Sequence, residues 1–270
     1  MIHISQRSSV ESELAAVAFG DRAGRWPLPA AITPHQQWLR AVGAGGQGRY
    51  GAAYADLAAL RGAAPSNRLS SLAHSAHASF LRQLGWHSLA RGWDGRAWAL
   101  AGDDPEAAGD ALTGLAADAL GVGRLAAAAA LLQRADPFVA QAPPRLAVRK
   151  AWVAAELAMF GGHGGVAVRN AEVAVELAAT RLGSARHQAK SQVVLAAALC
   201  SSDALERARD VADAALELTG QLGLVPLRWA VACLLVDLGT ETATRIAELR
   251  DLRDDCARRI EHCGGAWRKL

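Results

Sequence analysis

Apolar and small residues recur along this chain at steps of three and four residues, a spacing that places them on one face of an α-helix. The clearest copy of the pattern covers residues 112–135, where Gly123 separates two such stripes. A second clear copy covers residues 195–215, with Asp203 in the place of the glycine. Each copy predicts two amphipathic helices joined by a tight turn, which is a helical hairpin.

The pattern occurs six times at nearly regular intervals. From turn to turn the intervals are 37, 38, 40, 40 and 37 residues, enough for two helices and two short loops. A single hairpin cannot bury both of its apolar stripes, but a row of hairpins buries them against one another. The sequence therefore predicts an all-α fold, a stack of about six helical hairpins. The residues that mark the six turns are Gly48, Gly85, Gly123, His163, Asp203 and Thr240.

The chain divides into a repeat region and two ends. Residues 34–239 contain the hairpins. Residues 1–33 predict a short helix that caps the first hairpin, followed by a linker with Pro27 and Pro29. Residues 240–270 combine dense charge with an apolar stripe, which is the composition of a C-terminal capping helix with a polar outer face.

The second hairpin leaves its buried face open to two interpretations. Either Trp86 and Trp93 or Ala90 and Ala97 face inward.

No stretch alternates with the period of two that half-buried strands show, and aromatic residues, which favour strands, make up only 5% of the chain. We therefore expect helices throughout.

The first hairpin carries a resemblance to a known family. Residues 48–57 read Gly-Arg-Tyr-Gly-Ala-Ala-Tyr-Ala-Asp-Leu, and Pro65 follows at the exit. This resembles the second half of a tetratricopeptide repeat, and Trp38 lies near the large residue of its first helix, one residue closer to Tyr50 than the consensus. The resemblance covers roughly residues 34–239. Because the family's usual period is about 34 residues, a relative with longer loops is an equally good match. The resemblance implies a right-handed superhelical stack, an α-solenoid, whose first helices line a concave face.

Charge and hydropathy argue against nucleic acid and membranes as direct partners. The formal charge is +3 and the densest arginine run, residues 245–259, is interspersed with carboxylates, as on a solvated helix face. The longest apolar runs, such as 229–236, are eight residues, far short of the roughly 20 that span a bilayer. The excess of arginine over lysine, together with abundant alanine, indicates a GC-rich bacterial genome.

Four cysteines and two neighbouring histidines are the candidates for metal chemistry. Cys200 and Cys233 lie in apolar runs and are interpreted as small core residues. Cys256 and Cys263 are seven residues apart on one predicted helix, too far for an undistorted disulfide between them. Reduced cysteines favour a cytoplasmic location. His74 and His77 are three residues apart, but no acidic residue or cysteine follows nearby to complete a metal site, so both are interpreted as core or groove histidines.

Catalytic and cofactor motifs give no positive prediction either. The glycine-rich residues 43–48 follow a predicted helix instead of a strand, and no Lys-Ser or Lys-Thr pair follows them, so they predict a turn and not a phosphate loop. No serine or cysteine nucleophile is placed convincingly beside a base. We therefore expect no enzyme activity, no cofactor and no metal.

The leading hypothesis is an interaction module that binds a segment of a partner protein, acidic and hydrophobic in character, in its concave groove. The alternative is a regulatory sensor domain that binds a small molecule or a signal peptide there. The tetratricopeptide resemblance places groove positions on the first helix of each hairpin, and the partner-binding candidates are Arg40, Arg82, Lys150, Phe160 and Lys190.

Two of these candidates are lysines in a chain that otherwise uses arginine for positive charge. Lys150 and Lys190 are forty residues apart, near the starts of the first helices of adjacent hairpins. In a regular stack they would share one concave edge, with Phe160 further along. Three further positions, Val153, Leu157 and Val193, suit the groove and the packing between hairpins equally well.

Overall fold

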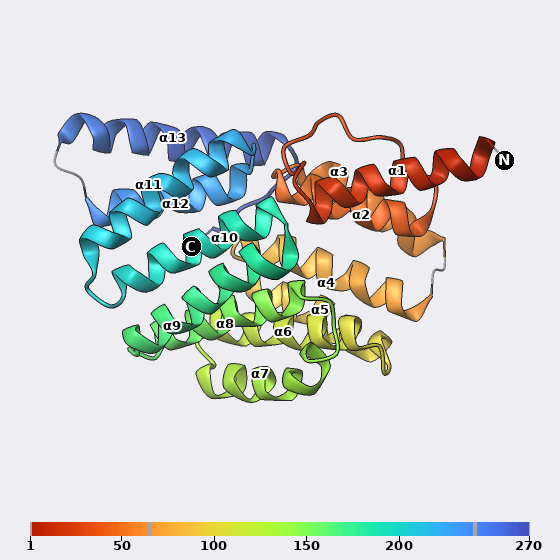
Figure 1. Ribbon diagram of the computed structural model, residues 1–270, viewed down its shortest axis with the longest axis horizontal. Helices are drawn as coiled ribbons and strands as arrows, with labels where there is room; N and C mark the ends of the chain where they lie inside the picture. The colour runs from red at the N-terminus through yellow and green to blue at the C-terminus, as the bar shows by residue number, and fades with distance from the viewer. Residues whose placement is uncertain (1, 64–65, 240–241, 270) are drawn as a thin grey trace.

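The computed structural model describes residues 2–63, 66–239 and 242–269, and within them all regular secondary structure is helical (Figure 1). The predicted all-α fold is confirmed. None of the described helices combines the length and the apolar character needed to cross a bilayer. The helices are α1 (Ile2–Phe19), α2 (Pro34–Gly46), α3 (Tyr50–Gly62), α4 (Asn67–Gln83), α5 (His87–Ala101), α6 (Pro105–Gly121), α7 (Leu125–Val139), α8 (Arg145–Phe160), α9 (Gly164–Leu177), α10 (Ala185–Cys200), α11 (Leu205–Gln221), α12 (Val225–Leu238) and α13 (Ala243–His262), with a π-helical turn at Ala178–Leu182.

Consecutive helices pair into six hairpins, from α2 with α3 to α12 with α13. The first helices of neighbouring hairpins (α2, α4, α6, α8, α10 and α12) also contact one another in order. We call these the inner helices, because second helices such as α7 lie on the outside (Figure 1). The inner helices are thus the elements whose side chains can meet across the middle of the molecule.

Among the residues that the structure describes, each hairpin turn contains one with a positive φ angle. This left-handed conformation favours glycine, and Asp203 is the one exception in these turns, at φ 60°. The fourth turn is centred on Gly162, one residue before the predicted marker His163, and Thr240 lies outside the described residues. The positive-φ residues of the six turns are Gly48, Gly85, Gly123, Gly162, Asp203 and Gly239.

Alanine allows the helices of a hairpin to pack closely. In the second hairpin Ala90 and Ala97 have no exposed surface, whereas Trp86 and Trp93 are half-buried, so the alanine interpretation of that hairpin is right. Small side chains bring helix axes together and leave few gaps. The same device recurs at fully buried alanines on the other second helices, among them Ala128, Ala135, Ala167, Ala171, Ala174, Ala208 and Ala212.

The C-terminal end returns to the first two hairpins. The Gly51 backbone N–H donates to the Cys263 carbonyl at 2.8 Å, and the Trp86 indole N–H donates to the Ala266 carbonyl at 2.7 Å. Ile260 of α13 and Val225 of α12 belong to the same buried apolar cluster as α1 to α4. The last hairpin therefore packs against the first.

The N-terminal end also reaches across the stack. Helix α1 packs on α2 and contacts α10, and the Ala185 N–H at the start of α10 donates to the Gly20 carbonyl at 3.0 Å. The Gln47 side-chain amide donates to the Ala23 carbonyl at 2.9 Å and so fixes the segment after α1. With both ends docked, the six hairpins form a closed ring with the inner helices on its inner side.

The positive φ of the hairpin turns can be tested with two matched substitutions. A Cβ added at Gly92, inside α5, or at Gly123, in the third turn, meets no other atom within 4 Å, and only Gly123 has positive φ (76°). We expect Gly92→Ala to stabilise the protein by about 0.5–1 kcal/mol and Gly123→Ala to destabilise it by about 1–2 kcal/mol. Urea unfolding measures both, and equal effects of the two substitutions would contradict the conformational explanation.

Candidate functional site

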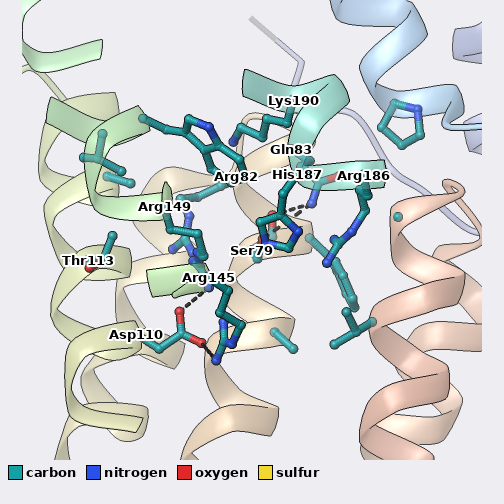
Figure 2. Close-up of a pocket in the computed structure, with 18 of the residues that line it drawn as sticks. Ser79, Arg82, Gln83, Asp110, Thr113, Arg145, Arg149, Arg186, His187 and Lys190 are labelled. Atoms are coloured by element: carbon teal, nitrogen blue, oxygen red, sulfur yellow. Dashed lines mark hydrogen bonds and ion pairs between the residues drawn. The ribbon is translucent and has the colours of Figure 1, made fainter. Parts of the chain in front are cut away.

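The inner helices surround a cavity of about 370 Å³. Its wall contains residues from every inner helix and from the end of α1, several of which are shown in Figure 2. The aromatic and charged members come from α1, α2, α4, α6, α8 and α10, whereas α12 contributes Pro226 and Leu227. The volume lies within the range of small-molecule sites in proteins. The aromatic wall residues are Phe19, Trp38, Phe80, Trp152 and Phe160, and the charged ones are Arg82, Asp110, Arg145, Arg149, Glu156, Arg186 and Lys190.

Three of the five groove residues predicted from the sequence line this cavity: Arg82, Phe160 and Lys190. The other two face away from it. Arg40 Nη1 donates to Asp56 of α3 at 2.9 Å, and Lys150 Nζ lies 2.6 Å from Asp136 of α7. Arg40 is therefore paired within its own hairpin, and Lys150 is paired with the second helix of the preceding hairpin.

The three apolar positions that suited either the groove or the packing between hairpins fall into two groups. Val153 lines the cavity. Leu157 packs instead against α6 and α7, and Val193 packs against the apolar cluster of α10 to α12. For these last two residues packing between hairpins is the better description.

The expected equivalence of Lys150 and Lys190 needs correction. Counted back from the positive-φ residue of each turn, Lys190 stands 13 residues before Asp203, and the residue 13 before Gly162 is Arg149. The one-residue shift of the fourth turn turns Lys150 toward α7 and Arg149 toward the cavity. Arg149 and Lys190 are therefore the structurally equivalent pair, and both line the cavity shown in Figure 2.

Two such equivalent positions form a row of charges across four inner helices. We call the residue 17 before each turn the first ladder position and the residue 13 before it the second. Residues four apart on a helix share one face, so both positions point the same way. From α4 to α10 the first position holds Arg68, Glu106, Arg145 and Arg186, and the second holds Leu72, Asp110, Arg149 and Lys190.

The carboxylates of α6 bind the cations on either side of them. Glu106 pairs with Arg68 and, at 2.9 Å, with Arg145 Nε. Asp110 pairs with Arg149 and, at 3.1 Å, with Arg145 Nη2. Burial by itself raises the pKa of Asp110, but the two guanidinium groups outweigh it and hold the pKa below the ordinary value.

Local sequence explains why α8 presents its arginines at this level. Pro143 and Pro144 precede the helix, and proline suits the start of a helix because it has no N–H to leave unpaired. Helix α8 therefore begins at Arg145, and Arg149 follows one turn later on the same face.

The start of α10 is fixed in a different way. The π-helical turn ends at Gly183, whose φ of 63° redirects the chain. Ser184 is fully buried, and its Oγ lies 2.8 Å from His187 Nδ1. The His187 ring also stacks on Trp152, with the ring centres 5.4 Å apart. These contacts hold Arg186 against the cavity wall.

His187 itself is not suited to proton transfer near neutral pH. Burial lowers its pKa well below the ordinary value, and the neighbouring cations Arg186, Arg145 and Arg149 lower it further. The ring is therefore neutral and serves as part of the aromatic wall.

The ladder of alternating charge breaks between α8 and α10. Where α6 presents carboxylates, α10 presents Arg186 and Lys190, two more cations next to Arg145 and Arg149. Arg186 donates to the Ala18 carbonyl at 3.1 Å, and its Nε is buried without a hydrogen-bond partner. Among the described residues no carboxylate lies within 4.0 Å of either α10 cation.

The unbalanced cations affect one another. Burial, and then Arg149 and Arg145, lower the pKa of Arg186 to about 10. Burial likewise lowers the pKa of Lys190, partly opposed by Glu156. The ammonium group of Lys190 lies 4.6 Å from the centre of the Trp152 ring, a cation–π contact that does not neutralise its charge. This part of the wall therefore carries excess positive charge.

Arg82, in contrast, is balanced by its own cluster. It donates to Asp94 of α5 and, at 3.0 Å, to Asp118 of α6, and the Asp94 side chain has no exposed surface. Because Gly114 has no Cβ, Asp94 can approach α6 closely. Burial raises the pKa of both carboxyl groups, to about 8 for Asp94, although the neighbouring Arg82 lowers both. At neutral pH Asp94 keeps its proton, and one carboxylate balances Arg82.

The histidines singled out in the sequence lie between α4 and α5. His77 stacks on Trp93 with ring centres 3.8 Å apart, and His74 Nδ1 lies 2.7 Å from the Ser70 carbonyl. Burial lowers the pKa of both rings. Within the part of the chain that the structure describes, no three side chains of the kind that bind metals gather at one place.

Neither the family models nor the curated proteins with which the chain was compared match it. The tetratricopeptide resemblance therefore stays a prediction. Sequence reasoning missed Arg145, Arg149, Trp152, Arg186 and His187 as wall residues. The recurrence of charged residues 17 and 13 positions before the turns that follow α4, α6, α8 and α10 was the signal that could have found the three missed ladder cations, Arg145, Arg149 and Arg186.

The raised pKa of Asp94 predicts a pH-dependent stability. A carboxyl whose pKa rises from 3.8 to about 8 on folding contributes stability that is present below pH 3.8 and lost as the pH rises through 8. We expect Asp94→Asn to remove part of the fall in melting temperature between pH 5 and 8, because the amide can still accept from Arg82 without titrating.

Asp103→Asn, at an exposed position just after α5, is the control, and its melting curve should follow that of the wild type. Calorimetry over this pH range measures both variants. Parallel pH profiles for the wild type and Asp94→Asn would show that Asp94 does not keep its proton in the fold.

Proposed function

We propose that this protein is a non-catalytic sensor or carrier domain whose central cavity binds a small molecule or the end of a signal peptide. The cavity of about 370 Å³ lined by all six inner helices carries this proposal. Its aromatic side chains provide apolar surface, and its charged groups provide orientation, which is the usual division in ligand sites.

The closed ring favours a compact ligand over a long one. Contacts of α1 with α10, and of the residues after α13 with α3 to α5, join the two ends of the stack. The inner helices therefore face a bounded space. An extended segment of a partner protein would need a groove that continues past both ends of the stack.

A second candidate is the interaction module expected from the sequence, and Phe160 favours it. This side chain is 68% exposed at the end of α8, yet it also belongs to the cavity wall. A large exposed aromatic ring at the rim of a cavity is suited to contact a partner residue, and burying it would contribute roughly 2 kcal/mol. In this case a partner segment would insert only its tip.

The proposal predicts ligand-induced stabilisation that depends on free space in the cavity. We would screen carboxylate- and phosphate-bearing metabolites and short acidic peptides by thermal unfolding. A ligand at 100 times its Kd should raise stability by about 2.7 kcal/mol, a shift of about 5–10 °C for a chain of this size. Ala117→Trp, which fills the cavity from α6, should remove the shift.

Ala126→Trp is the matched control, because Ala126 is exposed on α7 and does not line the cavity. It should respond to the ligand as the wild type does. A ligand that stabilises Ala117→Trp as strongly as the wild type would place binding outside the cavity. Peptide binding that survives Ala117→Trp but falls with Phe160→Ala would instead favour the rim and a partner protein.

A further inference from the structure

We infer that α8 and α10 form an anion subsite in which Arg149, Arg186 and Lys190 bind a carboxylate or phosphate group of the ligand. The subsite depends on the cavity being the ligand site proposed above, and it defines the chemical class of that ligand. Nothing else in the cavity wall combines unbalanced charge with open space.

The first step is the broken charge ladder. From α4 to α8, each cation at a ladder position contacts a carboxylate from α6, and Glu106 and Asp110 each contact two cations. Helix α10 repeats the cations of α8 without a new carboxylate. Charges removed from water are costly unless they are paired, and Arg186 and Lys190 are both half-buried. A negative charge supplied from outside the chain would therefore stabilise this second pair of cations.

The second step is the state of the α10 side chains. Arg186 faces the cavity with its Nε buried and unpartnered, although an arginine can donate five hydrogen bonds. The ammonium group of Lys190 lies over the face of Trp152, and its side chain lines the cavity. A cation–π contact occupies none of the three N–H donors of a lysine with a hydrogen-bond acceptor. Figure 2 shows Arg149, Arg186 and Lys190 on the wall of the same cavity, from two adjacent helices.

The third step is the balance of charge over the wall. Asp118 balances Arg82, and Glu106 balances Arg145. The remaining wall cations are Arg149, Arg186 and Lys190, and the remaining wall carboxylates are Asp110 and Glu156. The wall therefore has one more cation than carboxylates, which a ligand with at least one negative charge neutralises. Guanidinium groups bind carboxylate and phosphate in the same bidentate manner, so both remain candidates.

The surroundings define the rest of the ligand. Phe19 lies beneath both Arg145 and Arg186, with the guanidinium carbons 5.5 and 5.9 Å from the ring centre. Trp38 packs against Phe19, with ring centres 5.3 Å apart. Together with Trp152 these rings offer apolar surface next to the cations. The ligand class is therefore an anionic group attached to a compact apolar or aromatic body.

Three small probes test this assignment on the full chain: phenylacetate, phenyl phosphate and the uncharged phenylacetamide. Titration calorimetry should show that at least one of the two anions binds about ten-fold or more tightly than the amide, because charge-assisted hydrogen bonds form only with the anion. Which anion binds better then separates carboxylate from phosphate ligands. Raising the salt concentration should weaken anion binding.

Lys190→Gln should weaken anion binding about ten-fold and leave amide binding unchanged. Lys150→Gln is the matched control, because Lys150 has the same chemistry but is paired with Asp136 outside the cavity. Its anion affinity should equal that of the wild type. Equal losses in the two variants would indicate a general effect of net charge and would overturn the subsite.

Lys190→Glu should change ligand binding and thermal stability in opposite directions. A carboxylate here restores the alternation of charge, since it stands between Arg149 and Arg186 as Asp110 stands between Arg145 and Arg149. We expect this variant to lose anion binding and to melt at a higher temperature than the wild type without ligand. A melting temperature well below the wild type would mean that the cations need no countercharge, and it would contradict the inference.

The same experiments distinguish an error in the anion subsite from an error in the proposal that the cavity is the ligand site. If the amide binds the wild type as tightly as the two anions, and Ala117→Trp abolishes all three, the cavity binds ligands but the anion subsite is wrong. If neither the probes nor any compound of the metabolite and peptide screen binds the wild type, the cavity proposal and the subsite fail together.

Discussion

Charged side chains on the inner face of this ring are costly to hold there unless a charge of opposite sign lies next to them. The cost of removing an ion from water is large, and it is recovered only with close partners and complete hydrogen bonding. Glu106 and Asp110 satisfy this requirement for α4, α6 and α8. The same requirement makes the unbalanced cations of α10 the most informative part of the molecule, because no carboxylate of the described chain lies within 4.0 Å of them.

Closure of the ring converts this local imbalance into a site. In an open row of hairpins the cations of α10 would face water, which screens them at little cost. The docking of α1 on α10, and of the C-terminal residues on the first two hairpins, encloses the inner face. Screening is weaker there, and a ligand that supplies the missing charge gains more than it would on a surface.

Predicting which side chains line the cavity depended on the helical register of each hairpin, and the sequence defined that register only to within one residue. Arg82, Phe160 and Lys190 were identified because the hairpin pattern shows which residues belong to the inner helices. Lys150 was paired with Lys190 because the fourth turn was placed at His163 and not at Gly162. One residue rotates a helical side chain by about 100°, which is enough to exchange the cavity for a neighbouring helix.

The sequence by itself determined the helices, their pairing into six hairpins and the position of most turns, because the apolar period and the turn glycines are local signals. It also contained the charges of the ladder. Only the tertiary structure decided that Trp86 contacts Ala266, that Gly20 contacts Ala185 and that Arg186 and Lys190 share a cavity with Arg149. These contacts join residues far apart in the chain, and they depend on the summed curvature of six hairpins, which no single repeat encodes.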